Sequence, residues 1–126
     1  MALKSLGQRL RASVDDLERN RLSERFRGLG LTPLAEVVPR RPIRVGGEIS
    51  RVVIAPRHGV PTLEIRVSDG TGTITAVFTG RRSIIGIEHG RAVVFQGVAI
   101  PDKTGSATGH VIVNPAYTLI AAAGEH

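Results

Sequence analysis

The sequence predicts an all-β domain in which five strands close into a small barrel, preceded by a helical extension. Two observations support this prediction. The chain contains five strand-like runs, and in the two that flank an Asp-Gly turn apolar and polar residues alternate with a period of two, which is the pattern of a strand with one buried face. The apolar residues are mostly Val, Ile, Leu and Ala, and only 3% of the residues are aromatic, a composition that suits the half-buried surface of a sheet.

The clearest pair of strands flanks the turn Asp69-Gly70-Thr71-Gly72. Residues 62–68 and 73–79 alternate on either side of this turn, and Asp-Gly supplies the positive φ that tight hairpin turns need. We therefore expect a β-hairpin here. The alternative, a glycine-rich loop that cradles phosphate, is disfavoured because the carboxylate of Asp69 opposes an anion.

The first run, residues 44–55, is long for a strand and is expected to bend. It contains Gly46-Gly47 in its first half, and its apolar alternation slips near Ser50-Arg51, which predicts a β-bulge. A glycine and a bulge together let one strand serve two parts of a closed sheet. The residues expected to face the core are Val45, Ile49 and Val52.

The last two runs, 91–100 and 109–120, are separated by a hairpin tip rich in Gly, Ser and Thr. We expect Pro115 at a bulge or an edge, because proline cannot donate a ladder hydrogen bond. Ile84, Ile85 and Ile87, in the connector that follows the third run, are expected to form a short helix that plugs one end of the barrel. The inward residues expected in the last two runs are Val93, Phe95, Val111, Val113 and Leu119.

Upstream of the barrel, apolar residues recur at three- and four-residue steps from residue 3 to 29, which predicts a helix that is firmest from about 14 to 27. Three prolines make residues 30–42 a linker. An isolated helix of this length is marginal, so its apolar stripe needs the barrel, a second copy or a partner to pack against. The expected organisation is a helical extension and linker over 1–41, a barrel over 42–121, and a tail over 122–126.

Five strands, the first long and bent, with a short helix between the third and fourth, is the layout of the oligonucleotide/oligosaccharide-binding (OB) fold. A five-stranded SH3-like barrel is the alternative, but it usually lacks that helix and has shorter strands. The OB layout is preferred on both counts.

The order of several short motifs resembles OB domains of the bacterial RecG-helicase wedge type and small stand-alone actinobacterial OB-fold proteins. The resemblance covers roughly residues 42–120 and implies contact with single-stranded or branched DNA. It implies no motor activity, because the sequence has no Gly-x-x-x-x-Gly-Lys-Ser/Thr phosphate loop. The motifs are Gly47-x-Ile49, the turn from Asp69 to Gly72, Gly86-Ile87-x-x-Gly90-Arg91, Gly97-Val98 and Asn114-Pro115-x-Tyr117.

An OB fold binds ligands on the face of its second and third strands, between the loops that join strands one to two and four to five. Alternation places Thr62, Glu64, Arg66, Ser68, Thr73, Thr75, Val77 and Thr79 on that outer face. Arginine pairs bidentately with phosphate and stacks on bases. The candidate nucleic-acid-binding residues are Arg44, Arg51, Arg57, His58, Arg66, Thr75, Arg81, Arg82 and Lys103.

The net charge of +6 is compatible with a polyanionic partner but does not specify one, because residues 1–42 carry +4 of it and residues 43–126 only +2. Cysteine is absent, and the four histidines are scattered, which argues against a thiolate nucleophile and a metal site. No apolar run approaches the ~20 residues of a membrane helix, and no secretion signal is evident.

We therefore expect a non-enzymatic, cytoplasmic protein without a cofactor. It is expected to bind single-stranded or branched nucleic acid, DNA in preference to RNA, weakly and with little sequence preference. Phe78 and Phe95 are expected in the core, so that charge rather than base stacking supplies most of the attraction. The alternative is a protein-interaction adaptor that uses the barrel face or the N-terminal helix, the latter also a candidate for self-association.

Overall fold

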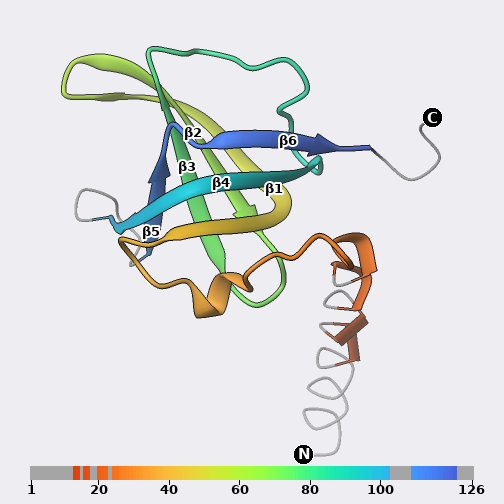
Figure 1. The fold of residues 1–126 in the computed structure, drawn as a ribbon. Coiled ribbons are helices and arrows are strands. Elements are labelled where there is room, and N and C mark those ends of the chain that lie inside the picture. The colour runs from red at the N-terminus through yellow and green to blue at the C-terminus, as the bar shows by residue number, and fades with distance from the viewer. Residues whose placement is uncertain (1–12, 15, 18–19, 23, 103–108, 122–126) are drawn as a thin grey trace, which may run out of the picture.

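The computed structural model describes residues 13–14, 16–17, 20–22, 24–102 and 109–121, and most of them belong to one sheet that curls into a barrel (Figure 1). The strands are β1 (Pro42–Arg57), β2 (Val60–Ser68), β3 (Thr73–Thr79), β4 (Ala92–Pro101), β5 (His110–Val113) and β6 (Ala116–Ile120). A 3₁₀ helix, η1 (Leu34–Glu36), precedes β1. No helix in the described part of the chain has the length and apolar character that a membrane crossing requires.

The barrel closes because β1 belongs to two ladders. From Pro42 to Glu48 it pairs with β4, and from Glu48 onward it pairs with β2. β2 continues to β3, β3 pairs in parallel with β5, and β5 pairs with β4, which completes the ring. The pairing register with β2 shifts between Ile49 and Arg51, so the predicted bulge is confirmed. The all-β barrel predicted from the alternating runs is confirmed with it.

The core consists of the inward side chains of these strands. Val45, Ile49, Ile65 and Phe95 are fully or almost fully buried, as period-two alternation requires. The prediction for Val52 is wrong, because its side chain is 38% exposed. Val52 lies beyond the bulge, where β1 has left the β4 ladder and β2 is the one described strand that still pairs with it.

The fifth run divides into two strands, and its inward phase is shifted by one residue from the prediction. Ile112 is the core residue, since it pairs with Ala76 of β3 and Ala99 of β4, which are both buried. Val111 and Val113 therefore lie on the outer face, where Val111 is covered and Val113 is exposed. The chain changes direction at Asn114, which has a φ of 47°, and β6 then pairs with β4.

The connector between β3 and β4 has no helix, contrary to prediction. Gly80, Gly86 and Gly90 all have positive φ values, which interrupt a helix. One side chain, Ile84, nevertheless enters the core and Ile87 packs against it, whereas the predicted third contributor, Ile85, is 98% exposed.

The described residues between 13 and 25 are helical, and the end of this helix contacts the barrel. Arg21 donates two hydrogen bonds of 2.7 Å to the carboxylate of Glu48 on β1, and Arg25 forms an ion pair with the same carboxylate. Phe26 lies over Gly46, where a Cβ atom would be 3.1 Å from its ring. Farther up the helix, Val14 and Leu17 are exposed.

The linker is more ordered than its prolines suggest, because the β2–β3 turn holds it. Asp69 accepts hydrogen bonds from Thr71 N and Gly72 N within the turn, and its second oxygen accepts one of 2.9 Å from Leu34 N. Thr71 Oγ1 accepts from Ala35 N. The predicted hairpin is present, and its tip also binds η1, whose Leu34 is buried in the core.

Candidate functional site

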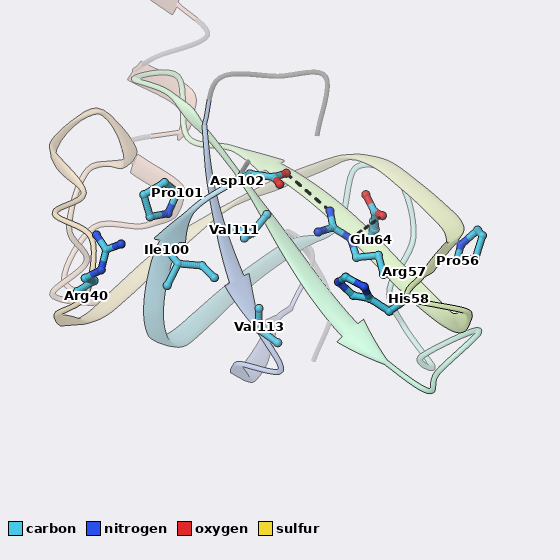
Figure 2. A pocket seen from close by; sticks show the side chains of 10 residues that line it. All are labelled: Arg40, Pro56, Arg57, His58, Glu64, Ile100, Pro101, Asp102, Val111 and Val113. Carbon is cyan, nitrogen blue, oxygen red and sulfur yellow. Dashed lines mark hydrogen bonds and ion pairs between the residues drawn. The ribbon is translucent and has the colours of Figure 1, made fainter. Parts of the chain in front are cut away.

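A groove of roughly 700 Å³ crosses the outer surface of the barrel (Figure 2). It lies between the β1–β2 tip, which contributes Arg57 and His58, and the ends of β4 and β5. Ile100, Val111 and Val113 supply apolar lining. The face of the second and third strands, on which the sequence predicted ligand binding, contributes Glu64 of β2 to this lining but no residue of β3.

The principal polar group of the groove is Arg57, whose charge is balanced by two carboxylates. Its Nε donates a hydrogen bond of 3.1 Å to Glu64 on β2, and its Nη2 lies 3.6 Å from Asp102 Oδ2 after β4 (Figure 2). The pKa of Arg57 is raised above its ordinary value, mainly by the hydrogen bond to Glu64, while burial acts in the opposite direction. Arg57 is therefore committed to an internal network rather than presented to a phosphate.

A second arginine group, here called the arginine row, lies beside the groove on the outer face of β1, β2 and β3. Arg66 of β2 is directly opposite Arg51 of β1 and Thr75 of β3. Cross-strand neighbours have Cβ atoms about 5 Å apart. Within the described residues, neither arginine forms an ion pair. Thr75 in turn pairs with Val111, so the row leads into the groove.

Among the described residues, no carboxylate balances the two positive charges of the arginine row. Like charges placed directly opposite each other destabilise a pair of strands. Both guanidiniums are on the outer surface, Arg51 exposed and Arg66 half-buried. An anion bound between them would relieve their repulsion and accept hydrogen bonds from both.

Two residues predicted on the outer face are buried instead. Thr62 has no exposed surface, and its hydroxyl donates to Val60 O. Val77 is 2% exposed because β5 covers it: Val113 pairs with it, and its carbonyl accepts a hydrogen bond from Asn114 N. The accessible outer face is smaller than alternation alone suggests.

The remaining candidates are dispersed. Arg44 donates to the carbonyl of Leu29 and lies opposite Gln96 on β4, so it holds the linker rather than joining the arginine row. Arg81 and Arg82 are exposed and follow Gly80, whose N–H donates to Pro61 O, so they lie at the end of β2 that carries the β1–β2 tip. Lys103 is outside the described residues.

Three polar residues of the groove were not named as contributors in the sequence analysis: Arg40, Asp102, and Glu64 in its role as an ion-pair partner. A signal for Glu64 was available, because alternation places it and Arg57 on the same face of one hairpin. No local signal predicts Arg40, which precedes the barrel. Arg40 itself has a φ of 66°, and it lines the groove.

Several solved structures have a fold similar to that of this barrel. An OBody, AM3L09, bound to hen egg-white lysozyme matches with a TM-score of 0.56 and 16% identity, over 71% of this chain and 92% of that one. RecG bound to a three-way DNA junction matches with a TM-score of 0.58 and 16% identity, over 70% of this chain. The barrel is an OB fold.

A second OBody bound to lysozyme, AM3L15, matches this OB barrel with a TM-score of 0.55 at 16% identity, over 75% of this chain and 92% of that one. This chain spans only 12% of the RecG chain. No family model and no curated protein matches. At 16% identity, the likeness to these structures concerns the fold alone.

Proposed function

We propose that this OB module is non-enzymatic and binds single-stranded or branched nucleic acid, DNA in preference to RNA, weakly and with little sequence preference. The observation that carries the proposal is the arginine row: Arg51 and Arg66 are adjacent on the outer face and have no acidic partner in the described part of the chain. The RecG structure that shares the fold is bound to a three-way DNA junction, which supports the choice of ligand.

The chemistry of the row suits a phosphodiester. A guanidinium presents several N–H donors in one plane, so two adjacent arginines can hold the oxygens of one phosphate from two sides. The Thr75 hydroxyl, next to Arg66, adds a neutral donor. Contacts from these groups to phosphates would position a nucleic acid without specifying its sequence, so little sequence preference is expected.

The proposed affinity is micromolar or weaker at physiological salt, because stacking contributes little. Proteins that bind single strands without sequence preference gain about 1–3 kcal/mol per base from stacking on exposed rings. Phe78 and Phe95 are buried, as predicted. Tyr117 is partly exposed, but it lies on β6 with its ring edge-on to Phe78 at 5.8 Å. With three to five phosphate contacts, log Kobs should fall against log[salt] with a slope of about −2 to −4.

Fluorescence anisotropy with single-stranded, forked and duplex oligonucleotides at two salt concentrations tests the proposal. Arg51→Ala/Arg66→Ala should weaken binding by about tenfold and make the salt slope less negative by about 1, since the one phosphate held by both arginines is no longer neutralised. The matched control, Arg27→Ala/Arg44→Ala, removes the same charge elsewhere and should change the affinity less than about twofold. Equal effects of the two double variants, or no binding by the wild type at low salt, would reject the proposal.

A second candidate, a protein-interaction adaptor, is favoured by the groove itself. Its lining combines aliphatic residues with an arginine whose charge two carboxylates already balance. The OBodies show that other barrels of this fold bind a protein. A partner seated in the groove would be lost with Val113→Asp, an exposed lining position, but retained with Arg51→Ala/Arg66→Ala. Association assays with both variants separate the two functions.

A further inference from the structure

The second half of β1 leaves part of its backbone without a neighbouring strand. On the side facing β4, the ladder ends at Glu48. The next residue, Ile49, still bonds to the segment just before β4: its N–H donates to Arg91 O and its carbonyl accepts from Gly90 N. From Arg51 onward, β1 pairs with β2 only, among the described strands. The backbone edge of Arg51–Pro56 that faces away from β2 therefore has no partner strand among the described residues. It is here called the open edge. It is about 20 Å long at the usual rise of an extended strand.

The side chains of the open edge are unusually apolar for an unprotected strand. Ile54 is 56% exposed and Val52 is 38% exposed, and both lie on the side of the hairpin that carries core residues Leu63 and Ile65. Proteins usually protect such an edge with charges, prolines or bulges. Here the bulge at Ser50 and the proline at Pro56 bound the open edge, while the stretch from Val52 to Ala55 has no charged residue.

The charges beside the open edge indicate what could occupy it. Arg51 is on the opposite side of the strand from Val52 and Ile54, next to Arg66. A partner strand with aliphatic residues against Val52 and Ile54 would therefore bring its alternate side chains to Arg51, where acidic groups are favoured and basic groups are repelled. A second copy of this chain fits less well, because each copy carries a net charge of +6 and would add arginines.

We propose that the open edge, Arg51–Pro56, is a docking site for an extended segment of another protein in which aliphatic residues alternate with acidic ones. Main-chain hydrogen bonds to the edge supply the attachment, and Val52, Ile54 and Arg51 select the segment by side chain. The proposal does not depend on the nucleic-acid function. Because both ligands use Arg51, however, a bound acidic segment and a nucleic acid compete for it.

The test uses a fluorescent peptide, Val-Glu-Val-Glu-Val-Glu, and its counterpart with lysine in place of glutamate. The glutamate peptide should bind the full chain at least about tenfold more tightly than the lysine peptide. It should also slow the hydrogen exchange of backbone amides between Arg51 and Ala55. Ile54→Lys, at an exposed position, should weaken binding by about fivefold or more. Ile85→Lys, at an exposed isoleucine in the connector, is the matched control and should bind as the wild type does.

Several outcomes would overturn the proposal. Equal binding of the two peptides, no effect of Ile54→Lys, or exchange protection confined to other strands would each do so. Self-association of the wild type that Ile54→Lys abolishes would assign the edge to a second copy instead. Ile54→Lys adds a positive charge and should not reduce oligonucleotide affinity, whereas Arg51→Ala/Arg66→Ala should. The failure of one proposal is thereby distinguished from the failure of the other.

Discussion

The two halves of β1 differ from each other in strand pairing and in burial. The first half, Pro42–Ile49, pairs with β4 up to Glu48, joins the β2 ladder from Glu48, and buries Val45 and Ile49 completely or nearly so. The second half, Arg51–Arg57, has only β2 beside it among the described strands (Figure 1). Its alternate side chains are exposed. One bulge at Ser50 separates them.

This difference shows how one strand divides structural and functional roles. The first half closes the ring and anchors the N-terminal helix through Glu48. The second half carries Arg51 of the arginine row and Arg57 of the groove, neither of which contributes to the core. Substitutions in the first half should therefore change stability, and those in the second half should change binding.

The largest effect is expected at Gly47. A Cβ atom there would lie 2.6 Å from the carbonyl oxygen of Ser68, which is backbone and cannot move aside. Gly47→Ala should destabilise the fold by about 3 kcal/mol or more, as overpacking against a fixed group does. Urea denaturation followed by circular dichroism measures the loss.

Gly46→Ala is the matched control for Gly47. Its new Cβ would meet the ends of two flexible side chains, Leu31 at 2.7 Å and Phe26 at 3.1 Å, which can shift. We expect Gly46→Ala to lower the free energy of unfolding by about 1 kcal/mol, because it disturbs the contact between the helix end and the barrel. A Gly47→Ala protein as stable as Gly46→Ala would contradict the closed β1–β2 contact at Ser68.

A smaller effect distinguishes the two halves with one substitution. Val45→Ala removes two buried methyl groups and should cost about 2 kcal/mol, from lost burial and the cavity left behind. Val52→Ala removes the same groups from a side chain that is already 38% exposed, and should cost about 0.5 kcal/mol. Equal losses in thermal or chemical denaturation would show that the second half is packed as tightly as the first.

The fold was largely predictable because alternation and turn chemistry are local signals. The hairpin around Asp69, the bulge at Ser50 and the burial of Phe95 all follow from patterns within about ten residues. The failures arose where position along the barrel decides burial. Val52 has a core-like phase but lies past the end of the β4 ladder. Ile112, rather than Val111 or Val113, faces the core because the fifth run divides at Asn114, so one phase does not hold along the whole run.

The site was less predictable because charge balance depends on contacts between distant segments. Arg57 and Arg66 look equivalent in the sequence, both being basic residues of the first hairpin. In the structure, Arg57 pairs with Glu64 and with Asp102, which is 45 positions away in the sequence. Arg66 lies beside Arg51, and no carboxylate of the described residues pairs with it. Alternation assigns a residue to a face, but it does not say which carboxylate arrives from another strand.

The smallest expected effect concerns the attachment of the helix to the first half of β1. The hydrogen bonds from Arg21, reinforced by Arg25 and opposed by burial, lower the pKa of Glu48 below its ordinary value of 4.5. A carboxyl with a lowered folded-state pKa contributes stability that is present above pH 4.5 and is lost as the pH falls through the folded-state pKa. Because Arg21 is nearly half exposed, solvent screens the pair, and the contribution should be under about 1 kcal/mol.

Unfolding free energies of the wild type and Glu48→Gln, measured from pH 6 to pH 3, isolate this contribution. The wild type should lose up to about 1 kcal/mol more than Glu48→Gln on acidification, because glutamine cannot titrate. The other carboxyls titrate in both proteins and cancel in the difference. Parallel pH profiles would mean that the ion pairs of Arg21 and Arg25 with Glu48 do not hold the helix end on the barrel. The two halves of β1 would then differ only in strand pairing and burial.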